Sequence, residues 1–232
     1  MRRNGISFNS SVTPNATSMS DAPTTRWWWV RHAPVTANRG CCYGQIDFPC
    51  EVGDAALFVS LAKRLPHGAA WVATPLQRTQ MTAAALVAAG LDGPAAIPGP
   101  GVTIEAALIE QHFGEWQGIR YDELAARRGE AWHRFWLAPA HETPPGGESF
   151  VALMARVHAA IDRLNRQFAG RDILAVTHGG TIRAALALAL DLSPEAALAF
   201  VIDNLSLTRI DHIAGAAVGQ GWRVGAVNQP PL

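Results

Sequence analysis

Residues 172–183 have the sequence DILAVTHGGTIR, in which a short apolar run is followed by a polar turn and a second apolar stretch. The run at 172–177 predicts a buried β-strand, and His178-Gly179-Gly180 predicts a turn into a helix over residues 181–190. A strand that passes at once into a helix is the repeating unit of α/β proteins. This stretch therefore indicates a mostly parallel sheet that carries helices on its faces.

Four further segments are apolar, rich in aromatic and β-branched residues, and bounded by turn residues, as β-strands are. By residue number they are 27–30, 70–73, 205–210 and 222–227. The first two of them run into polar residues and helix signals, as the segment at 172–177 does. We therefore expect an α/β fold with three α/β/α layers and a mostly parallel central sheet.

Helix signals lie between the predicted strands. Asp54 can cap one helix, and Thr74-Pro75 can cap and begin the next. From Ser149 onward, apolar side chains recur with helical spacing and predict a long amphipathic helix. Residues 93–147 are less regular, with many Gly and Pro, so we expect a cap-like insertion there.

The composition indicates one domain. The chain has 232 residues, of which 49% are hydrophobic and 16% charged, enough apolar material for one buried core. Residues 1–25 consist mainly of Asn, Ser, Thr and Pro, so we expect a disordered tail before a single domain at 26–232. No segment has the apolar length of a secretory signal or a membrane span. The three cysteines lack zinc-knuckle spacing and are typical of reduced thiols, so we expect a cytoplasmic protein.

The charge balance limits the partners. The 19 basic and 19 acidic residues cancel, which argues against a broad surface for a polyanion such as nucleic acid. A few arginines gathered in one cleft can still attract a small anion. We therefore expect a small phosphorylated substrate as the partner, with no nucleic acid and no membrane, and the sequence leaves a homodimer open.

Polar side chains follow three of the predicted strands. Arg31-His32 follows the first strand, Arg78 lies just beyond the second, and His178 follows the third. The carboxyl ends of parallel strands share one edge of a sheet, and such folds bind ligands at that edge. We therefore expect two histidines and two arginines to meet in one pocket.

These residue types suit phosphoryl transfer. Two arginine forks match the oxygens of a phosphate and neutralise its charge. A neutral imidazole, for which His32 is the candidate, can attack phosphorus and form a covalent intermediate. His178 would add a donor beside the helix start at Gly179, and Glu110, in a glycine-containing loop, is the candidate acid for the leaving oxygen.

Each of these residues alone has a simpler explanation. A single histidine at a strand end is more often a packing residue, an isolated arginine is usually solvated, and a Gly-Gly pair is often only a turn. Their joint placement at successive strand ends is what favours a site. Zinc-dependent chemistry is not favoured, because the eight histidines lack any short ligand spacing.

Four segments, in order along the chain, resemble the signature blocks of the histidine phosphatase superfamily, in its phosphoglycerate mutase-like branch. They are residues 30–33 (VRHA), 74–83 (TPLQRTQMTA), 110–118 (EQHFGEWQG) and 177–183 (THGGTIR). The resemblance extends over about residues 26–211. It is strongest to the α-ribazole phosphatase group and its broad-specificity relatives.

The resemblance implies a phosphoglycerate mutase-like fold, a phosphorylated His32, Glu110 as the proton donor, and neither a metal nor another cofactor. It also implies a set of residues that bind the substrate phosphate: Arg31, Asn38, Arg78, His178 and Gly179. The phosphate-binding residues belong to the first, second and fourth blocks or to their continuation. Glu110 lies in the third block.

The sequence departs from the family pattern directly after His32. Ala33 replaces the usual Gly, Pro34 the usual acidic residue, and Val35 a common Ser or Thr, for which Thr36 is the neighbouring substitute. Gly180 is typical of the phosphatase members, whereas mutases more often carry Asn there. The pocket walls are expected from residues 118–147, whose Trp132, Phe135 and Trp136 either stack on a ligand or fill core.

The function that follows is a histidine acid phosphatase-type phosphomonoesterase, a metal-independent hydrolase of a small metabolite such as an α-ribazole 5′-phosphate. Two alternatives remain open at this point. A phosphoglycerate mutase would share the same core and return the phosphoryl group to a second hydroxyl. A non-catalytic phospholigand-binding module would explain the substituted segment at 33–35.

Overall fold

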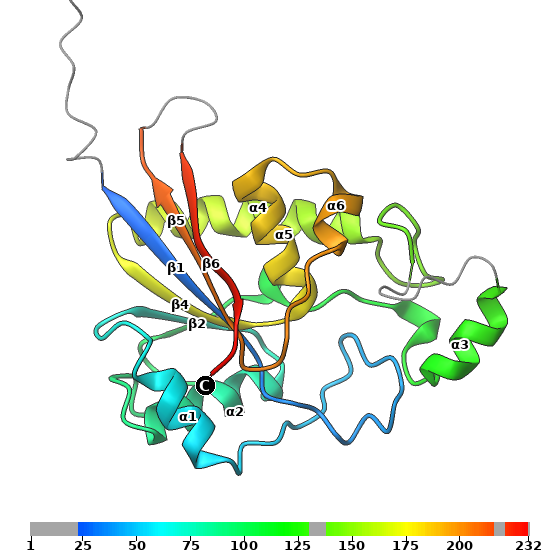
Figure 1. Ribbon diagram of the computed structural model, residues 1–232, viewed down its shortest axis with the longest axis horizontal. Helices are drawn as coiled ribbons and strands as arrows, with labels where there is room; N and C mark the ends of the chain where they lie inside the picture. Colours follow the sequence, from blue (N-terminus) through cyan, green and yellow to red (C-terminus); the bar gives the residue numbers. More distant parts are fainter. Residues whose placement is uncertain (1–22, 130–137, 216–220, 232) are drawn as a thin grey trace, which may run out of the picture.

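The computed structural model describes residues 23–129, 138–215 and 221–231. Within them, six strands form one sheet in the order β3-β2-β4-β1-β5-β6 (Figure 1). The strands are β1 (Thr24–Arg31), β2 (Ala70–Ala73), β3 (Val102–Ile104), β4 (Asp172–Thr177), β5 (Leu207–Ile213) and β6 (Trp222–Gln229). The predicted α/β class is confirmed.

The strands that precede the candidate site residues lie in the parallel half of the sheet. β2 pairs in parallel with β3 and β4, and β4 pairs in parallel with β1. β1 also pairs with β5, and β5 with β6, but both of these pairings are antiparallel. The two predicted closing strands are thus present and extend a mainly parallel sheet with an antiparallel edge.

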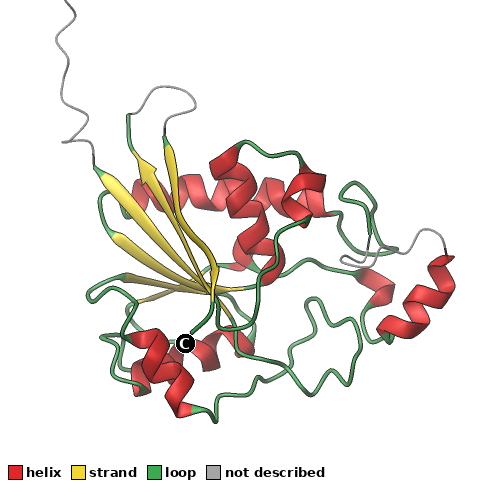
Figure 2. Ribbon diagram, viewed as in Figure 1, coloured by secondary structure: helices red, strands yellow, loops and turns green. Residues whose placement is uncertain are grey.

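Helices cover both faces of the sheet (Figure 2). The helices are α1 (Ala55–Ala62), α2 (Gln77–Ala88), α3 (Tyr121–Arg128), α4 (Phe150–Gln167), α5 (Gly179–Leu190) and α6 (Pro194–Leu198), with short 3-10 turns η1 (Ala106–Leu108) and η2 (Gly114–Trp116). α1 and α2 lie on one side and α4, α5 and α6 on the other (Figure 1). Asp54 accepts from Leu57 N and caps α1, as predicted, and Ser149 accepts from Ala152 N and caps α4.

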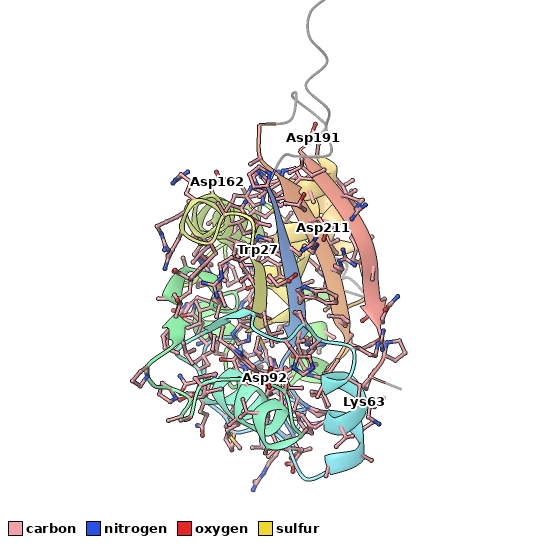
Figure 3. All side chains as sticks on the ribbon, turned by 90° about the vertical axis from the view of Figure 1, so that its left-hand side faces the viewer. Trp27, Lys63, Asp92, Asp162, Asp191 and Asp211 are labelled. Carbon is pink, nitrogen blue, oxygen red and sulfur yellow. The ribbon has the colours of Figure 1, made fainter. Side chains whose placement is uncertain are left out.

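Alternating side chains of the central strands fill two separate cores. In β4, Ile173 belongs to the core beneath α4 and α5, whereas Leu174 belongs to the core beneath α1 and α2. In β1, Trp27 and Trp29 stack with ring centroids 4.5 Å apart, on the α4 side. The Trp27 indole points toward α4 and donates to Asn165 Oδ1 at 2.8 Å (Figure 3). A strand buried on both faces explains the unbroken apolar runs in the sequence.

The N-terminal boundary lies earlier than expected. We predicted a tail over residues 1–25, but β1 begins at Thr24 and residues 1–22 lie outside the described part. Thr25 is buried, and its hydroxyl accepts a hydrogen bond from Gly170 N at 3.0 Å. A polar residue can therefore occupy a strand start, where composition alone suggested a tail.

α2 also begins later than expected. We predicted that Thr74 caps the helix, but the helix starts at Gln77. The backbone N–H of Gln77 donates a hydrogen bond to Asp47 Oδ1 at 2.7 Å. The Thr74 hydroxyl lies instead 3.0 Å from His178 Nε2. The Thr74 hydroxyl thus contacts His178, which is distant in the sequence, whereas the local capping rule had assigned this hydroxyl to the helix.

The stretch at 93–147 contains more structure than predicted. Its residues 102–104 form β3 at the edge of the sheet, and α3 lies away from the sheet beside the loop of residues 33–50 (Figure 1). Residues 130–137, which include the three aromatic residues considered above, lie outside the described part. Across the described ranges, no helix combines the length and apolarity that a bilayer crossing requires.

Candidate active site

The carboxyl ends of β1 and β4 bring together the side chains that follow them. The register pairs Arg31, the last residue of β1, with Thr177, the last residue of β4. His32 and His178 come next in the two chains, and their ring centroids lie 5.3 Å apart. Arg78 reaches the same place from the first turn of α2 and is fully buried. We call Arg31, His32, Arg78 and His178 the strand-end cluster.

The environment of His32 fixes which ring nitrogen carries the proton. Nδ1 lies 2.7 Å from the carbonyl oxygen of Ala33, which can only accept a hydrogen bond. In the neutral ring, therefore, Nδ1 carries the hydrogen and Nε2 carries the lone pair. Asn204 donates to the His32 carbonyl at 2.8 Å and fixes the backbone at this position. The result is an oriented imidazole with a free basic nitrogen.

His178 is completely buried and caps the amino end of α5. Its Nε2 lies 3.0 Å from the hydroxyl of Thr74, and its Nδ1 has no partner among the described residues. A buried ring nitrogen without a partner is costly unless something else bonds to it. The free Nδ1 is thus a polar group of the cluster that an incoming ligand can satisfy.

Both histidines are held in the neutral form. Burial, with the positive charges of Arg31 and Arg78, holds the pKa of His32 well below its ordinary value. Burial, with the positive charge of Arg78, does the same to the pKa of His178. A neutral imidazole keeps its lone pair, so a low pKa preserves a nucleophile in mildly acidic solution.

The lowered pKa values predict that acid destabilises the fold. In the unfolded chain each histidine takes up a proton near pH 6.5, whereas in the folded protein His32 and His178 stay neutral to lower pH. The unfolded state then binds more protons, which costs the fold about 1 kcal/mol per histidine between pH 6.5 and 5.5. Urea unfolding across this range measures the slope. The variant His178→Gln should show a shallower slope, and an unchanged slope would contradict the argument.

Arginine side chains converge on the start of α5. A Cβ built on Gly179 would lie 3.6 Å from Arg31 Nε and 3.7 Å from Arg183 Nη1, so both guanidinium groups lie over this residue. Arg31 Nη1 donates to Ile202 O at 2.5 Å, while its buried Nε has no partner among the described residues. Arg78 donates to Ile46 O at 2.8 Å and Gly44 O at 2.6 Å.

The charges of this region do not balance. The guanidinium groups of Arg78 and Arg183 lie within electrostatic range of Arg31 and of the Glu110 carboxylate, and Arg78 also lies within range of the Asp47 carboxylate. Burial lowers the pKa of Arg78 and of Arg183, which shows that both cations are poorly solvated. Three cations and two carboxylates leave a net charge of plus one, and this excess favours an anionic ligand.

Glu110 joins the site from the loop after η1. Its carboxylate accepts from the backbone N–H of Gly180 at 3.2 Å and so rests against the first turn of α5. A Cβ on Gly180 would lie 2.4 Å from Glu110 Oε1, so this contact requires a glycine. The observation gives a physical reason for the Gly-Gly pair at 179–180.

The remaining predicted residues have other surroundings. Gly179 begins α5 beneath the arginines, as expected for a backbone anion contact. Asn38, by contrast, donates its amide to Cys41 O at 3.0 Å within its own turn. Thr36 is exposed and donates to Glu51, so its hydroxyl does not take the position left by Val35. Gly179 thus lies beneath the arginines, while the Asn38 amide has a partner within its own turn.

Sequence reasoning did not assign a role in the site to Thr74, Arg156 or Arg183. Arg183 lay in a quoted motif, and its spacing of one helical turn from Gly179 could have indicated that it returns to the helix start. The contacts of Thr74 and Arg156 depend on tertiary structure and leave no local pattern. As to cations, no group of three or more His, Cys, Asp or Glu side chains in the described ranges converges as a metal site would require.

Comparisons with known proteins agree with this geometry. The sequence model of the histidine phosphatase superfamily (branch 1) matches residues 27–225. Over 220 residues the chain is 37% identical to a bifunctional protein of Mycobacterium tuberculosis, covering 91% of this chain but 57% of that protein. The chain thus spans little more than half the length of this relative.

Two phosphatases are similar over their full length. The adenosylcobalamin/alpha-ribazole phosphatase of Salmonella typhimurium is 26% identical over 209 residues, which cover 88% of this chain and 99% of that protein. The structure of a mycobacterial glucosyl-3-phosphoglycerate phosphatase superposes with a TM-score of 0.72 at 27% identity, covering 89% of this chain and 99% of the other.

Proposed function

The chain belongs to the histidine phosphatase superfamily, and from this premise we propose that it hydrolyses phosphomonoesters through a phosphohistidine at His32. The observation that carries the proposal is the state of His32. Its ring is oriented by Ala33 O, which leaves the lone pair on Nε2, and it is kept neutral by burial and by the charges of Arg31 and Arg78, within a cluster that has an excess of positive charge. A structural histidine would not need that combination.

The first step transfers the phosphoryl group to the protein. The arginines and the helix start at Gly179 hold the three phosphate oxygens. His32 Nε2 attacks phosphorus, a P–N bond forms, and the bond to the leaving oxygen breaks. Glu110 in its acid form gives its proton to that oxygen, so an alcohol departs and a carboxylate remains. The unpartnered Nδ1 of His178 is a further contact for a phosphate oxygen.

The second step returns His32 to its free form. The Glu110 carboxylate removes a proton from water as the water oxygen bonds to phosphorus. The P–N bond then breaks, inorganic phosphate leaves, and both Glu110 and His32 are restored. Each residue thus acts twice, in opposite directions, and the chemistry calls on no metal ion.

The hydrolase proposal is preferred to the mutase alternative because of Gly180. Its missing side chain makes room for the Glu110 carboxylate, whereas an Asn in its place would displace that carboxylate from its position against α5. A mutase would return the phosphoryl group to a second hydroxyl of the substrate, so free phosphate as the main product distinguishes the two reactions. The proposed substrate is a small phosphorylated metabolite of the cytoplasm.

The proposal is tested by trapping the intermediate. Substrate labelled with radioactive phosphate is mixed with the enzyme and quenched in base, in which phosphohistidine survives. We expect one labelled peptide that contains His32, and unchanged turnover when a chelator is present. The substrate panel should include α-ribazole 5′-phosphate, glucosyl-3-phosphoglycerate and phosphoserine. If no label reaches His32 while substrate is consumed, the mechanism is wrong, and if ligand binds without turnover, the chain is a binding module.

A further inference from the structure

One arginine outside the strand-end cluster donates hydrogen bonds to three main-chain carbonyl oxygens in the segment that ends at Glu110. Arg156 lies on α4, and its Nη1 donates to Ala107 O and Ile109 O, both at 2.8 Å. Its Nη2 donates to the carbonyl oxygen of Glu110 at 3.0 Å. The guanidinium therefore holds the main chain immediately before and at the candidate acid.

The same guanidinium is fixed from its other side by Glu148. Arg156 Nε donates to Glu148 Oε2 at 3.0 Å, and Nη2 donates to Oε1 at 2.6 Å. The side chains of the pair are only 22% and 20% exposed. A guanidinium has five N–H donors, and here five protein acceptors take them. Arg156 is thus held in one geometry, with no donor left over for a ligand.

Glu148 also forms hydrogen bonds with the Glu110 loop directly. Its Oε1 accepts from His112 N at 2.9 Å, its backbone N–H donates to His112 O at 2.8 Å, and its carbonyl accepts from the Gln111 amide at 2.9 Å. The two loops approach each other closely, since a Cβ on Gly147 would lie 2.4 Å from His112 O. The segment on both sides of Glu110 is therefore clamped by one ion pair.

These contacts fix the main chain at Glu110, and the carboxylate extends from this fixed main chain toward α5. Gln45 adds a hydrogen bond to the Glu110 carbonyl at 2.8 Å, and Gly180 N bonds the carboxylate at the far end. General acid catalysis depends on the distance between the acid and the leaving oxygen, and an error of about 1 Å can cost two orders of magnitude in rate. Most of the contacts that set this distance come from Arg156 and Glu148.

From this arrangement we infer that the Arg156–Glu148 ion pair is the positioning device of the proton donor Glu110. Arg156 touches no reacting atom; its charge also lies within range of His178, but its hydrogen bonds act on Glu110, and Arg156→Lys, which keeps the charge, separates the two effects. The inference rests on the proposed function, because it takes Glu110 as the acid that protonates the leaving oxygen. It assigns a specific kinetic effect to a residue that lies on the helix layer rather than in the pocket.

The kinetic effect is a dependence on the leaving group. A nitrophenyl phosphate releases a stable anion and needs little protonation, whereas an alkyl phosphate needs a proton on the leaving oxygen. For Arg156→Met we expect kcat/KM of an alkyl phosphate to fall roughly 30-fold, and that of nitrophenyl phosphate to fall less than about threefold. The ratio kcat/KM is measured because it reports the steps through departure of the leaving group.

Glu110→Gln is the reference and should show the same pattern with a larger loss, about 100-fold or more for the alkyl phosphate. In the double variant, Arg156→Met should add little to Glu110→Gln, because a misplaced acid and an absent acid give the same defect. Arg156→Lys, which keeps the charge but has three donors in place of five, should fall between Arg156→Met and the unchanged protein. If Arg156→Met does not fold, Arg156→Lys provides the test in its place.

Arg163→Met is the matched control. Arg163 lies on the same helix and pairs with Glu105, whose side chain accepts from Ala107 N at 2.9 Å. It therefore contacts the start of the same segment without reaching Glu110. We expect its leaving-group dependence to match that of the unchanged protein.

Three results separate the two proposals. Equal losses on both substrates for Arg156→Met and Arg156→Lys would overturn the positioning role, and so would additive losses in the double variant. A Glu110→Gln variant without leaving-group dependence would instead remove Glu110 from its proposed role. Phosphohistidine formation at His32 is read independently in each variant.

Discussion

The variant His32→Ala is expected to lose turnover of every phosphomonoester, by at least about 10⁴-fold. The neutral ring, bonded through Nδ1 to Ala33 O, supplies the attacking lone pair at Nε2. Methyl in its place leaves the arginines and Glu110 but no atom that can bond to phosphorus. The measurement is release of inorganic phosphate in steady state, together with the loss of label from the base-stable adduct.

A second histidine variant controls for general damage. His67 is exposed, pairs with Asp92 on the surface, and precedes the amino end of β2, whereas the strand-end cluster follows the carboxyl ends of the strands. His67→Ala should keep the activity of the unchanged protein. Phosphate release by His32→Ala above the uncatalysed background would contradict the covalent mechanism, provided that the variant unfolds as cooperatively as its parent.

The variant Arg78→Lys should have the second largest effect, a loss of about 10³-fold in kcat/KM. Arg78 is fully buried, and hydrogen bonds to Ile46 O and Gly44 O fix the plane of its guanidinium. Its Nε has no partner among the described residues and remains for a ligand. An ammonium group cannot keep both loop carbonyls and also bind two phosphate oxygens.

Product inhibition separates binding from folding in this variant. The inhibition constant of inorganic phosphate should rise with Arg78→Lys, because the lost contacts are to phosphate itself. Arg127→Lys serves as the control, since Arg127 is exposed and pairs with Glu123 one turn away on α3. Unchanged phosphate inhibition in Arg78→Lys would show that Arg78 holds the loop and does not bind the ligand.

The fold was predictable where local and global preferences agree. The strand at 172–177 has its predicted limits, because its residues are apolar on both faces and Gly170 and His178 bound it. β3 was not predicted, because three half-exposed residues after a Gly- and Pro-rich segment carry no periodicity. The antiparallel direction of β5 and β6 was not assigned either, since apolar alternation does not state strand direction.

The candidate site followed from the sheet topology. His32 and His178 are 146 positions apart, yet parallel pairing of β1 with β4 places them at one edge. Arg156 could not be found in this way. It contacts main-chain carbonyls, which every residue has, so no residue type in the Glu110 loop marks its partners.

The order of the strands has a consequence for synthesis of the chain. β1 lies between β4 and β5, and both of these partners are made much later, since Arg26 pairs with Asp172 and Asp211. At ordinary translation speeds the interval is on the order of ten seconds. During that time the tryptophan-rich strand has unpaired edges and no covering helix α4, which is the kind of segment that associates with other chains. A ribosome that stalls before residue 172 would therefore release an aggregation-prone fragment, and chaperone binding to nascent chains should centre on residues 24–31.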